Sequence, residues 1–364
     1  MSVPLTVPNR QAELMALFQR HGFAPSDVPI LQPAEPFIEL SGEEIRRRLF
    51  LVSEGTDEET CLRPEFTIPA ARAVIAHGGA PRADLAFVGP VFRQRADAAG
   101  EFVQAGLESF GRTDVAAADA DMLALALETE ALLGGRLLAI RIGDVGLLSA
   151  VIAALELPAA LARRLRQTGL NSIGRPVTAP ESNGLAGYRG VLSALKGADP
   201  AEARAFVKDL LSIAGLKAVG GRTPAEIADR FLEKAEDGGA GLSPRQEEVL
   251  RQFAAIAGSP AEVAAGIRAL AKSHGVDLHA AIDRFEARNA AFVARGLNLD
   301  RFEVSTAFAR NLDYYTGFVF EFIAPGRDRP AIAGGRYDGL LRRLGAADDC
   351  PAVGCAIWLE RFED

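Results

Sequence analysis

Hydrophobic residues recur at helical spacing near the start of the chain and then give way to prolines. Residues 9–21 place Leu14 and Phe18 on one side, and Gly22 follows as a residue suited to end a helix. Prolines at positions 25, 29, 33 and 36 predict an extended or turn-rich stretch after this helix. A second helix is expected over residues 68–77, where two glycines follow.

Two apolar runs with strand character come next. Residues 84–92 and 102–110 are expected to be strands, and the short polar segment 93–101 between them predicts a hairpin. A helix is expected over residues 119–133, with an aspartate at its start and glycines at its end. Residues 137–142 are expected to form another strand.

The pattern changes at about residue 147 and changes back near residue 298. Between these positions Ala, Leu, Arg and Glu dominate, with apolar residues at helical spacing, which predicts an all-helical block. Strands are expected again over residues 302–308 and 318–323, and a helix over 337–344 after a glycine-rich turn. A strand and a helix close the chain.

Strands, then helices, then strands again predict an α+β fold interrupted by a helical insertion. The expected boundaries are residues 1–146 for the first part of the core, 147–299 for the insertion and 300–364 for the second part of the core. The insertion, of about 150 residues, is large enough to be a domain of its own.

Composition narrows the class of protein. The chain has 364 residues, 49% of them apolar, and a net charge of -8, which argues mildly against a nucleic-acid binder. The arginine clusters at 46–48 and 163–166 suit phosphate binding or, more commonly, the solvated face of a helix. Three scattered cysteines predict no disulfide framework and, with four histidines, no metal site. No membrane span and no signal peptide are recognisable, so a cytoplasmic protein is expected.

The segment Phe102–Phe110 carries the first candidate chemistry. Alternation along a strand puts Gln104, Gly106 and Glu108 on one face, opposite an apolar face. A glycine inside a strand often marks close approach by a ligand or another backbone. Taken alone, this polar face fits either the floor of a ligand pocket or the solvent side of an antiparallel sheet.

Tyrosines beside glycines favour a pocket. Two of the four tyrosines, Tyr314 and Tyr315, lie in the segment 309–317, and Tyr337 lies in the glycine-rich segment 333–339. Such a combination fits a pocket that hydrogen-bonds a small ring with polar edges.

Ordered motifs along the chain resemble those of histidyl-tRNA synthetases. The segment ARNLDYYTGFVFE resembles the histidine-recognition motif of this family, AGGRYDGL its second histidine motif, and LRPEFT its LRPEGT segment. The segments GPVFR and FVQAGLESFG resemble class II motif 2 and its continuation, and AVGCAIWLER resembles motif 3. The matches cover residues of about 1–140 and 300–364, and they imply a class II synthetase-like antiparallel sheet.

The resemblance implies a histidine pocket whose groups match the ligand. Glu65, Thr67 and Gln104 would hold the α-amino group, Glu108 and Tyr315 would bind the imidazole with Tyr337 nearby, and Arg310 would face the carboxylate. A protonated amine needs acceptors and a carboxylate needs a guanidinium, so the chemistry agrees with these roles. The complete set of histidine-binding residues that we expect is Glu65, Thr67, Arg93, Gln104, Glu108, Arg310, Tyr314, Tyr315 and Tyr337.

The nucleotide side departs from the synthetase pattern. Arg95 stands where motif 2 requires a glutamate, and the loop after it carries no basic residue to stabilise charge on a phosphate. Trp358 replaces a small glycine before Leu-Glu-Arg, where an indole would intrude on the nucleotide, although Arg361 is kept. No anticodon-binding domain is expected after motif 3, since the chain stops at Asp364.

This combination resembles the family of regulatory subunits of ATP phosphoribosyltransferase. The resemblance implies a non-catalytic homodimer that assembles with a short-form catalytic subunit, activates it and transmits feedback inhibition by L-histidine, with no tRNA, membrane or cofactor. Two alternatives stay open. One is a truncated class II enzyme that adenylates histidine or a related amino acid, and the other is a free-standing histidine-binding protein.

Overall fold

The fold is given by a computed structural model that describes residues 7–362 apart from 54–58, 79–81, 97, 135–137, 159–160, 163–164, 166–169, 171–241 and 309–313. The chain forms two compact units, one made of residues 1–154 with 252–364 and the other of residues 155–251. Within the described part of the chain, no helix is both long enough and apolar enough to cross a membrane.

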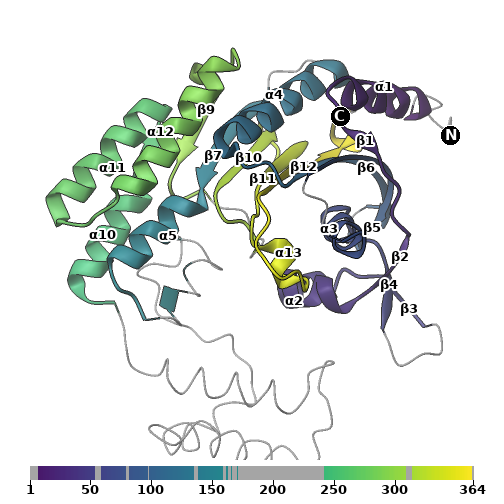
Figure 1. Ribbon diagram of the computed structural model, residues 1–364, viewed down its shortest axis with the longest axis horizontal. Helices are drawn as coiled ribbons and strands as arrows, with labels where there is room; N and C mark the ends of the chain where they lie inside the picture. Colours follow the sequence, from purple (N-terminus) through teal and green to yellow (C-terminus); the bar gives the residue numbers. More distant parts are fainter. Residues whose placement is uncertain are drawn as a thin grey trace, which may run out of the picture. The chain divides into compact units, whose positions relative to one another are not determined.

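A nine-stranded sheet forms the centre of the first unit, in the order β1-β5-β6-β12-β11-β10-β7-β9-β8 (Figure 1). The six strands from β5 to β7 in this order are antiparallel, and parallel pairs occur only towards the edges, between β1 and β5 and between β7 and β9. The α+β class and the antiparallel sheet core predicted from the sequence are therefore confirmed. The strands are β1 (Ala24–Pro25), β5 (Ala83–Phe92), β6 (Glu101–Phe110), β7 (Ala139–Asp144), β8 (Ala257–Gly258), β9 (Phe302–Ser305), β10 (Phe318–Ile323), β11 (Ile332–Arg336) and β12 (Ala352–Trp358).

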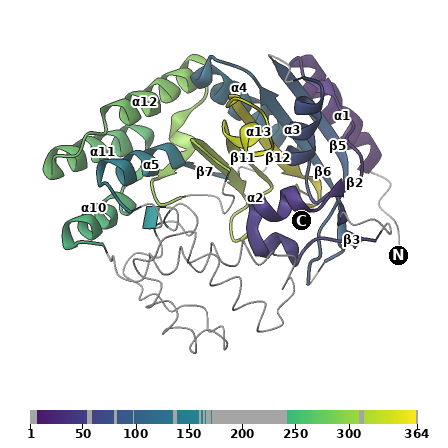
Figure 2. The same cartoon turned by 60° about the horizontal axis from the view of Figure 1, so that its bottom comes forward.

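Helices cover both faces of this sheet (Figures 1 and 2). Helices α1 and α4 pack on one face, against β5, β6, β11 and β12, while α2, α3 and α13 lie on the other. A small antiparallel sheet, β2-β4-β3, also belongs to this unit. The helices and small strands are α1 (Val7–Arg20), β2 (Leu31–Pro33), α2 (Glu35–Arg46), β3 (Leu51–Val52), β4 (Thr60–Leu62), α3 (Thr67–Ala76), α4 (Val115–Leu133), α5 (Val145–Ala154), α11 (Pro260–His274), α12 (His279–Ala294), η3 (Leu299–Arg301), α13 (Leu340–Arg343) and η4 (Leu359–Phe362).

The predicted hairpin is confirmed, and its burial shows why it lies in the middle of the fold. Strands β5 and β6 pair over their full lengths, from Ala83 opposite Phe110 to Phe92 opposite Glu101. Most of β6 is buried on both faces, because β5 and β12 flank it and helices cover it above and below. The polar face of this strand is therefore not the solvent side of the sheet, and this alternative reading of the sequence is excluded.

Two expectations near the end of the core were wrong. The expected helix 337–344 is only Leu340–Arg343, and Gly334 and Gly335 lie inside strand β11 instead of in a turn. The reason is close packing of strands, because a Cβ atom on Gly334 would lie 2.6 Å from the Cβ of Cys355 on β12. Glycine-rich segments look alike in sequence whether they make a turn or admit a neighbouring strand.

Two further elements differ from the sequence pattern. Helix α2 begins at Glu35 inside the proline-rich stretch, with Pro36 in its first turn, where a missing N–H costs nothing. Strand β9 ends at Ser305, short of the expected residue 308, because the chain turns at Thr306, whose hydroxyl donates to the Ile256 carbonyl at 3.1 Å.

Helices dominate the described part of the predicted insertion. Helix α10 (Pro244–Ala254) is followed by α11 and α12, and α11 begins with a capping box formed by Ser259 and Glu262. Helices α11 and α12 belong to the first compact unit. The boundaries 147–299 stay a prediction, because most of residues 159–241 lie outside the described part of the chain.

Candidate functional site

A cavity of about 280 Å³ opens on the face of the sheet that carries α2, α3 and α13. It gathers side chains from segments far apart in the sequence, including β6, β12, the segment before β10 and the end of β11. Of the residues predicted from the sequence for the histidine pocket, seven line it: Glu65, Thr67, Arg93, Gln104, Tyr314, Tyr315 and Tyr337. Arg310 lies outside the described residues.

Glu108 links two residues that line this cavity, Thr67 and Tyr337. One carboxyl oxygen accepts a hydrogen bond from the Thr67 hydroxyl at 2.5 Å, and the other accepts one from the Tyr337 hydroxyl. Only 2% of Glu108 is exposed. Strand β6 thus places the predicted imidazole-binding carboxyl where residues from α3 and from the end of β11 meet.

Burial decides the charge of this carboxyl. Removal from water raises the pKa of Glu108 to about 8, against the two hydroxyl donors, which stabilise the carboxylate and lower it; nearby Glu65 raises it further. The group is therefore a carboxyl that changes charge near neutral pH inside the cavity. Such a group can donate or accept a hydrogen bond, as either tautomer of an imidazole requires.

Glu65 prepares the start of helix α3. Its carboxyl oxygens accept the backbone N–H groups of Thr67 and Ile68 at 2.6 and 2.9 Å, so the first turn of the helix is satisfied. Burial raises the pKa of Glu65, and these two backbone donors and the charge of Arg93 oppose that rise. The carboxyl is held in one orientation at the wall of the cavity.

Gln104 has a buried polar atom that the protein leaves unsatisfied. Its side chain is 1% exposed, and no acceptor among the described residues reaches its Nε2 atom. Buried amide groups are hydrogen-bonded in nearly all native structures. An unsatisfied amide in the wall of a cavity therefore indicates a ligand that supplies the missing partner.

The three tyrosines form one aromatic cluster around the cavity. The ring centres of Tyr314 and Tyr315 are 5.0 Å apart, and those of Tyr314 and Tyr337 are 5.7 Å apart. Arg93 lines the same cavity, and its Nε donates to the Pro64 carbonyl at 2.7 Å. The cluster provides flat apolar walls with hydroxyl groups at their edges, which suits a small polar ring.

The residues predicted for a degenerate nucleotide site lie around Trp358. Arg95 forms an ion pair with Glu360, at 2.5 Å, and its guanidinium lies over the Phe102 ring. Arg361 stacks on Trp358, with 4.4 Å from its guanidinium carbon to the ring centre. Burial lowers the pKa of Arg361 to about 10; Glu360 opposes this change, and neighbouring arginines add to it. Trp358 lines the cavity, and no acceptor among the described residues reaches its Nε1 atom.

Several residues that shape the site were not found from the sequence. Arg48, which the sequence offered only as part of a basic cluster, lines the cavity just after α2, and Gly354 and Cys355 line it from β12. Gly354 gives room for the Glu108 carboxyl, because a Cβ at this position would overlap that group and lie 2.5 Å from the Leu107 carbonyl. The AVGCA segment was a recognisable signal, but the strand that it approaches was not.

The close approach predicted at Gly106 was misplaced. A Cβ on Gly106 would make an ordinary contact, 3.4 Å from the Cys355 carbonyl, and the residue does not line the cavity. The crowded glycine is Gly354, opposite Glu108 in the register between β12 and β6. Among the described residues, no group of three or more His, Cys, Asp or Glu side chains is placed to hold a metal ion.

Comparison with known proteins gives a consistent family. The family model described as histidyl-tRNA synthetase matches residues 7–171 and 205–362. The ATP phosphoribosyltransferase regulatory subunit of Mesorhizobium japonicum is 40% identical, over 98% of this chain and 97% of that protein. The protein of the same name from Allorhizobium ampelinum is 37% identical, over 99% and 98% of the two chains.

A solved structure agrees with the fold. The crystal structure of an ATP phosphoribosyltransferase regulatory subunit/histidyl-tRNA synthetase from Bacillus halodurans matches with a TM-score of 0.67 at 18% identity, covering 100% of this chain and 80% of that chain. At this identity the likeness shows a common histidyl-tRNA synthetase-like fold and nothing finer.

Proposed function

The chain belongs to the family of ATP phosphoribosyltransferase regulatory subunits, which share a histidyl-tRNA synthetase-like domain, and from this premise we propose that it is a histidine-binding regulator. In this proposal L-histidine occupies the cavity around Glu108. The chain activates a short-form catalytic subunit of ATP phosphoribosyltransferase. Histidine bound to the chain inhibits that catalytic subunit, which provides feedback inhibition.

The observation that carries the proposal is the unsatisfied amide N–H of Gln104, in a cavity that the half-buried Glu65 also lines, with the buried Glu108 on the same strand. Free histidine has an ammonium group, a carboxylate and an imidazole, and each needs a partner when it leaves water. We assign the ammonium group, which only donates, to acceptor oxygens of Glu65, Thr67 and Gln104, and the carboxylate of the same ligand to the Nε2 of Gln104, which lacks an acceptor among the described residues. A charge-assisted bond contributes about 1.5–3 kcal/mol, so a few of them support a micromolar ligand.

The imidazole is assigned to Glu108 and Tyr315, with Tyr337 beside them. The hydroxyls of Thr67 and Tyr337 already hold both oxygens of the Glu108 carboxyl in place, so little reorganisation is needed when the ring binds. Arg93, which lines the cavity, and Arg310 are assigned to the carboxylate.

A regulatory and non-catalytic role fits the other end of the cavity. Adenylation requires cations free to bind phosphates, but Arg95 is engaged by Glu360 and Arg361 is stacked on Trp358. We therefore propose that the chain adenylates no amino acid and binds no tRNA. We also propose that it works in the cytoplasm as a homodimer within a hetero-oligomer.

Calorimetric titration with L-histidine tests the ligand, and repeating it with a short-form catalytic subunit present tests the coupling. We expect binding that Glu108→Ala abolishes and that Glu101→Gln, an exposed carboxylate on the same strand, leaves unchanged. If titration with L-histidine gives no heat of binding, the ligand assignment is overturned.

Two assays test the role. The chain should raise the activity of the catalytic subunit, and histidine should lower it only when the chain is present. Histidine-dependent ATP–pyrophosphate exchange by the chain alone would instead support a truncated synthetase. Failure to capture a catalytic subunit would favour a free-standing histidine-binding protein.

A further inference from the structure

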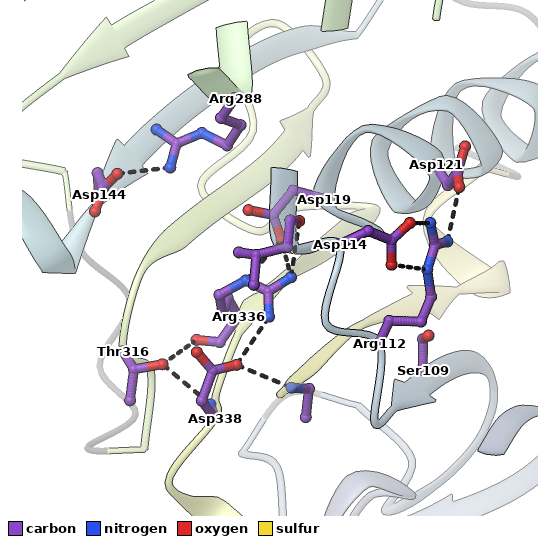
Figure 3. A network of polar contacts seen from close by, with 12 residues as sticks. Ser109, Arg112, Asp114, Asp119, Asp121, Asp144, Arg288, Thr316, Arg336 and Asp338 are labelled. Carbon is purple, nitrogen blue, oxygen red and sulfur yellow. Dashed lines mark hydrogen bonds and ion pairs between the residues drawn. The ribbon is translucent and has the colours of Figure 1, made fainter. Parts of the chain in front are cut away.

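Arg336, which directly precedes Tyr337 in the sequence, is buried, and its guanidinium is the centre of a network of polar contacts (Figure 3). Its Nε and Nη2 atoms donate to one carboxyl oxygen of Asp119, at 2.9 and 2.7 Å, and Nη2 also donates to the Val115 carbonyl. Asp119 lies on α4, which covers the opposite face of the sheet from the cavity. Because successive residues of a strand point to opposite faces, Arg336 anchors to α4 the same backbone that presents Tyr337 to the cavity.

The network continues from Arg336 to the segment that carries the other two tyrosines. Its Nη1 atom donates to Asp338 at 2.8 Å, and the backbone N–H of Asp338 donates to the Thr316 hydroxyl at 3.0 Å. The backbone N–H of Thr316 in turn donates to the Arg336 carbonyl at 2.8 Å. Thr316 follows Tyr315 directly. These hydrogen bonds therefore hold the segment that contains Tyr314 and Tyr315 against the end of β11.

Close contacts without hydrogen bonds tighten the same junction. A Cβ on Gly335 would lie 3.0 Å from the ring of Tyr315, and a Cβ on Gly317 would lie 3.4 Å from the Arg336 side chain. Gly335 therefore lets the Tyr315 ring approach the backbone of β11, whereas the contact at Gly317 is an ordinary one. The rings of Tyr314, Tyr315 and Tyr337 contact one another at this junction.

A second buried pair holds the far side of this segment. Arg288 on α12 donates to Asp144 at 2.6 Å, and the N–H of Val145 donates to the Gly317 carbonyl at 2.9 Å (Figure 3). The short segment after Tyr315 thus lies between two arginine–aspartate pairs, and the Arg336 pair is the one next to Tyr337 in the sequence.

Buried ion pairs contribute little to stability on balance, because two charges must leave water. Apolar residues of similar size often replace such pairs at no loss of stability, whereas removing one partner is strongly destabilising. Arg336 is 4% exposed and Asp119 2%. Their pairing therefore calls for an explanation other than stability, and its geometry supplies one.

We propose that Arg336, held by Asp119, is a positioning residue for the ligand cavity, which sets Tyr315 and Tyr337 at the spacing that receives the ring of a bound amino acid. The proposal rests on the proposed function for the identity of the ligand, L-histidine. The contacts that define the positioning role belong to the free protein.

The double variant Arg336→Met/Asp119→Leu tests this role, because it removes both buried charges and leaves neither unpaired. We expect its melting temperature to stay within several degrees of the parent while the Kd for L-histidine rises by about tenfold or more. The control is Arg112→Met, which breaks the ion pairs from Arg112 to Asp114 and Asp121 near the same helix. It should leave the Kd within about twofold. A folded double variant with the parent Kd would overturn the proposal.

Thr316→Val keeps the buried pair and serves if the double variant does not fold. It removes only the hydroxyl, which accepts from the Asp338 N–H and donates to the Arg336 carbonyl, and we expect a several-fold weaker Kd with little change in melting temperature. Thr316→Ser keeps the hydroxyl and should restore the parent Kd. Equal binding by the valine and serine variants would count against the network.

Hydrogen exchange in the free protein separates this proposal from the proposed function. Amides of residues 314–317 should exchange at least about tenfold faster in the double variant or in Thr316→Val than in the parent, and at the parent rate in Arg112→Met. If the parent binds no histidine but exchange accelerates, the ligand is wrong and the positioning role stands. Unchanged exchange in a folded double variant would overturn the role whatever the parent binds.

Discussion

Tyr337 donates a hydrogen bond from its hydroxyl to the carboxyl of Glu108 in a place where each residue is only 2% exposed. The two residues are far apart in the sequence and come from strand β6 and from the end of β11, with β12 between these strands. Burial raises the pKa of the Tyr337 hydroxyl well above its usual value, and the neighbouring Glu108 raises it further. The tyrosine therefore stays a hydrogen-bond donor, and Glu108 is the member of the pair that changes charge.

The pH dependence of stability should report this carboxyl. The folded chain holds the Glu108 proton up to about pH 8, whereas the unfolded chain releases it near its ordinary pKa. This contribution is fully present below about pH 4 and is lost as the pH rises to about 8, with a slope of up to about 1.4 kcal/mol per pH unit. Urea denaturation of the parent and of Glu108→Gln between pH 4 and 9 measures the difference, since glutamine cannot ionise.

Glu101→Gln is the control for this measurement, because Glu101 is exposed at the start of the same strand. It should leave the slope unchanged. Parallel stability curves for the parent and Glu108→Gln would show that burial does not raise the pKa of Glu108.

Gly354→Ala should damage both stability and the cavity. A Cβ at this position overlaps the Glu108 carboxyl and comes within 2.5 Å of the Leu107 carbonyl, so one of these groups must move. We expect a loss of about 1–3 kcal/mol in the free energy of unfolding and loss of histidine binding. Gly106→Ala, on the neighbouring strand, is the control, because its Cβ would make only an ordinary contact. Equal behaviour of the two variants in denaturation and calorimetry would contradict this account.

Trp358 should report ligand binding by fluorescence. It is the only tryptophan in the chain and it lines the cavity, in register with Gln104 on β6. A ligand that fills the cavity changes the surroundings of the indole, so titration with L-histidine should change its emission to saturation. Trp358→Phe should lose the optical signal and keep the heat of binding. Constant emission during a titration that shows heat would place the ligand elsewhere.

Arg95→Glu restores the residue that synthetases have in motif 2 but should not restore their chemistry. The new carboxylate would face Glu360, which now pairs with Arg95 in a partly exposed position. We expect a loss of up to about 1 kcal/mol in the free energy of unfolding and no histidine-dependent ATP–pyrophosphate exchange. Arg95→Glu/Glu360→Arg should recover the stability. Exchange activity in the single variant would mean that one residue separates this chain from a synthetase.

Histidine should also stabilise the folded chain against heat. At a concentration about a hundredfold above Kd, a ligand that binds only the folded state contributes about 2.7 kcal/mol. Thermal denaturation with and without histidine measures this shift, and Glu108→Ala should abolish it while the protein stays folded. A normal shift in the variant would remove Glu108 from the imidazole site.

The sequence by itself determined the class of fold and most of the cavity's polar residues. Periodicity reports how each segment meets water and the core, so the β5–β6 hairpin and helices α1, α3 and α4 were predictable. The face shared by Gln104 and Glu108 follows from the two-residue repeat of a strand. The short motifs placed the tyrosines, because their spacing is written within single segments.

Only the tertiary structure decided which strands meet and what each glycine is for. Gly334 and Gly335 read as a turn, yet they lie in β11 because strand β12 approaches them closely. Gly354, not Gly106, is the crowded glycine, since the register of β12 on β6 sets it opposite Glu108. The pairing of Arg336 with Asp119 joins β11 to α4 across the sheet. Such contacts link residues distant in sequence, so no local pattern records them, and packing in three dimensions settles them.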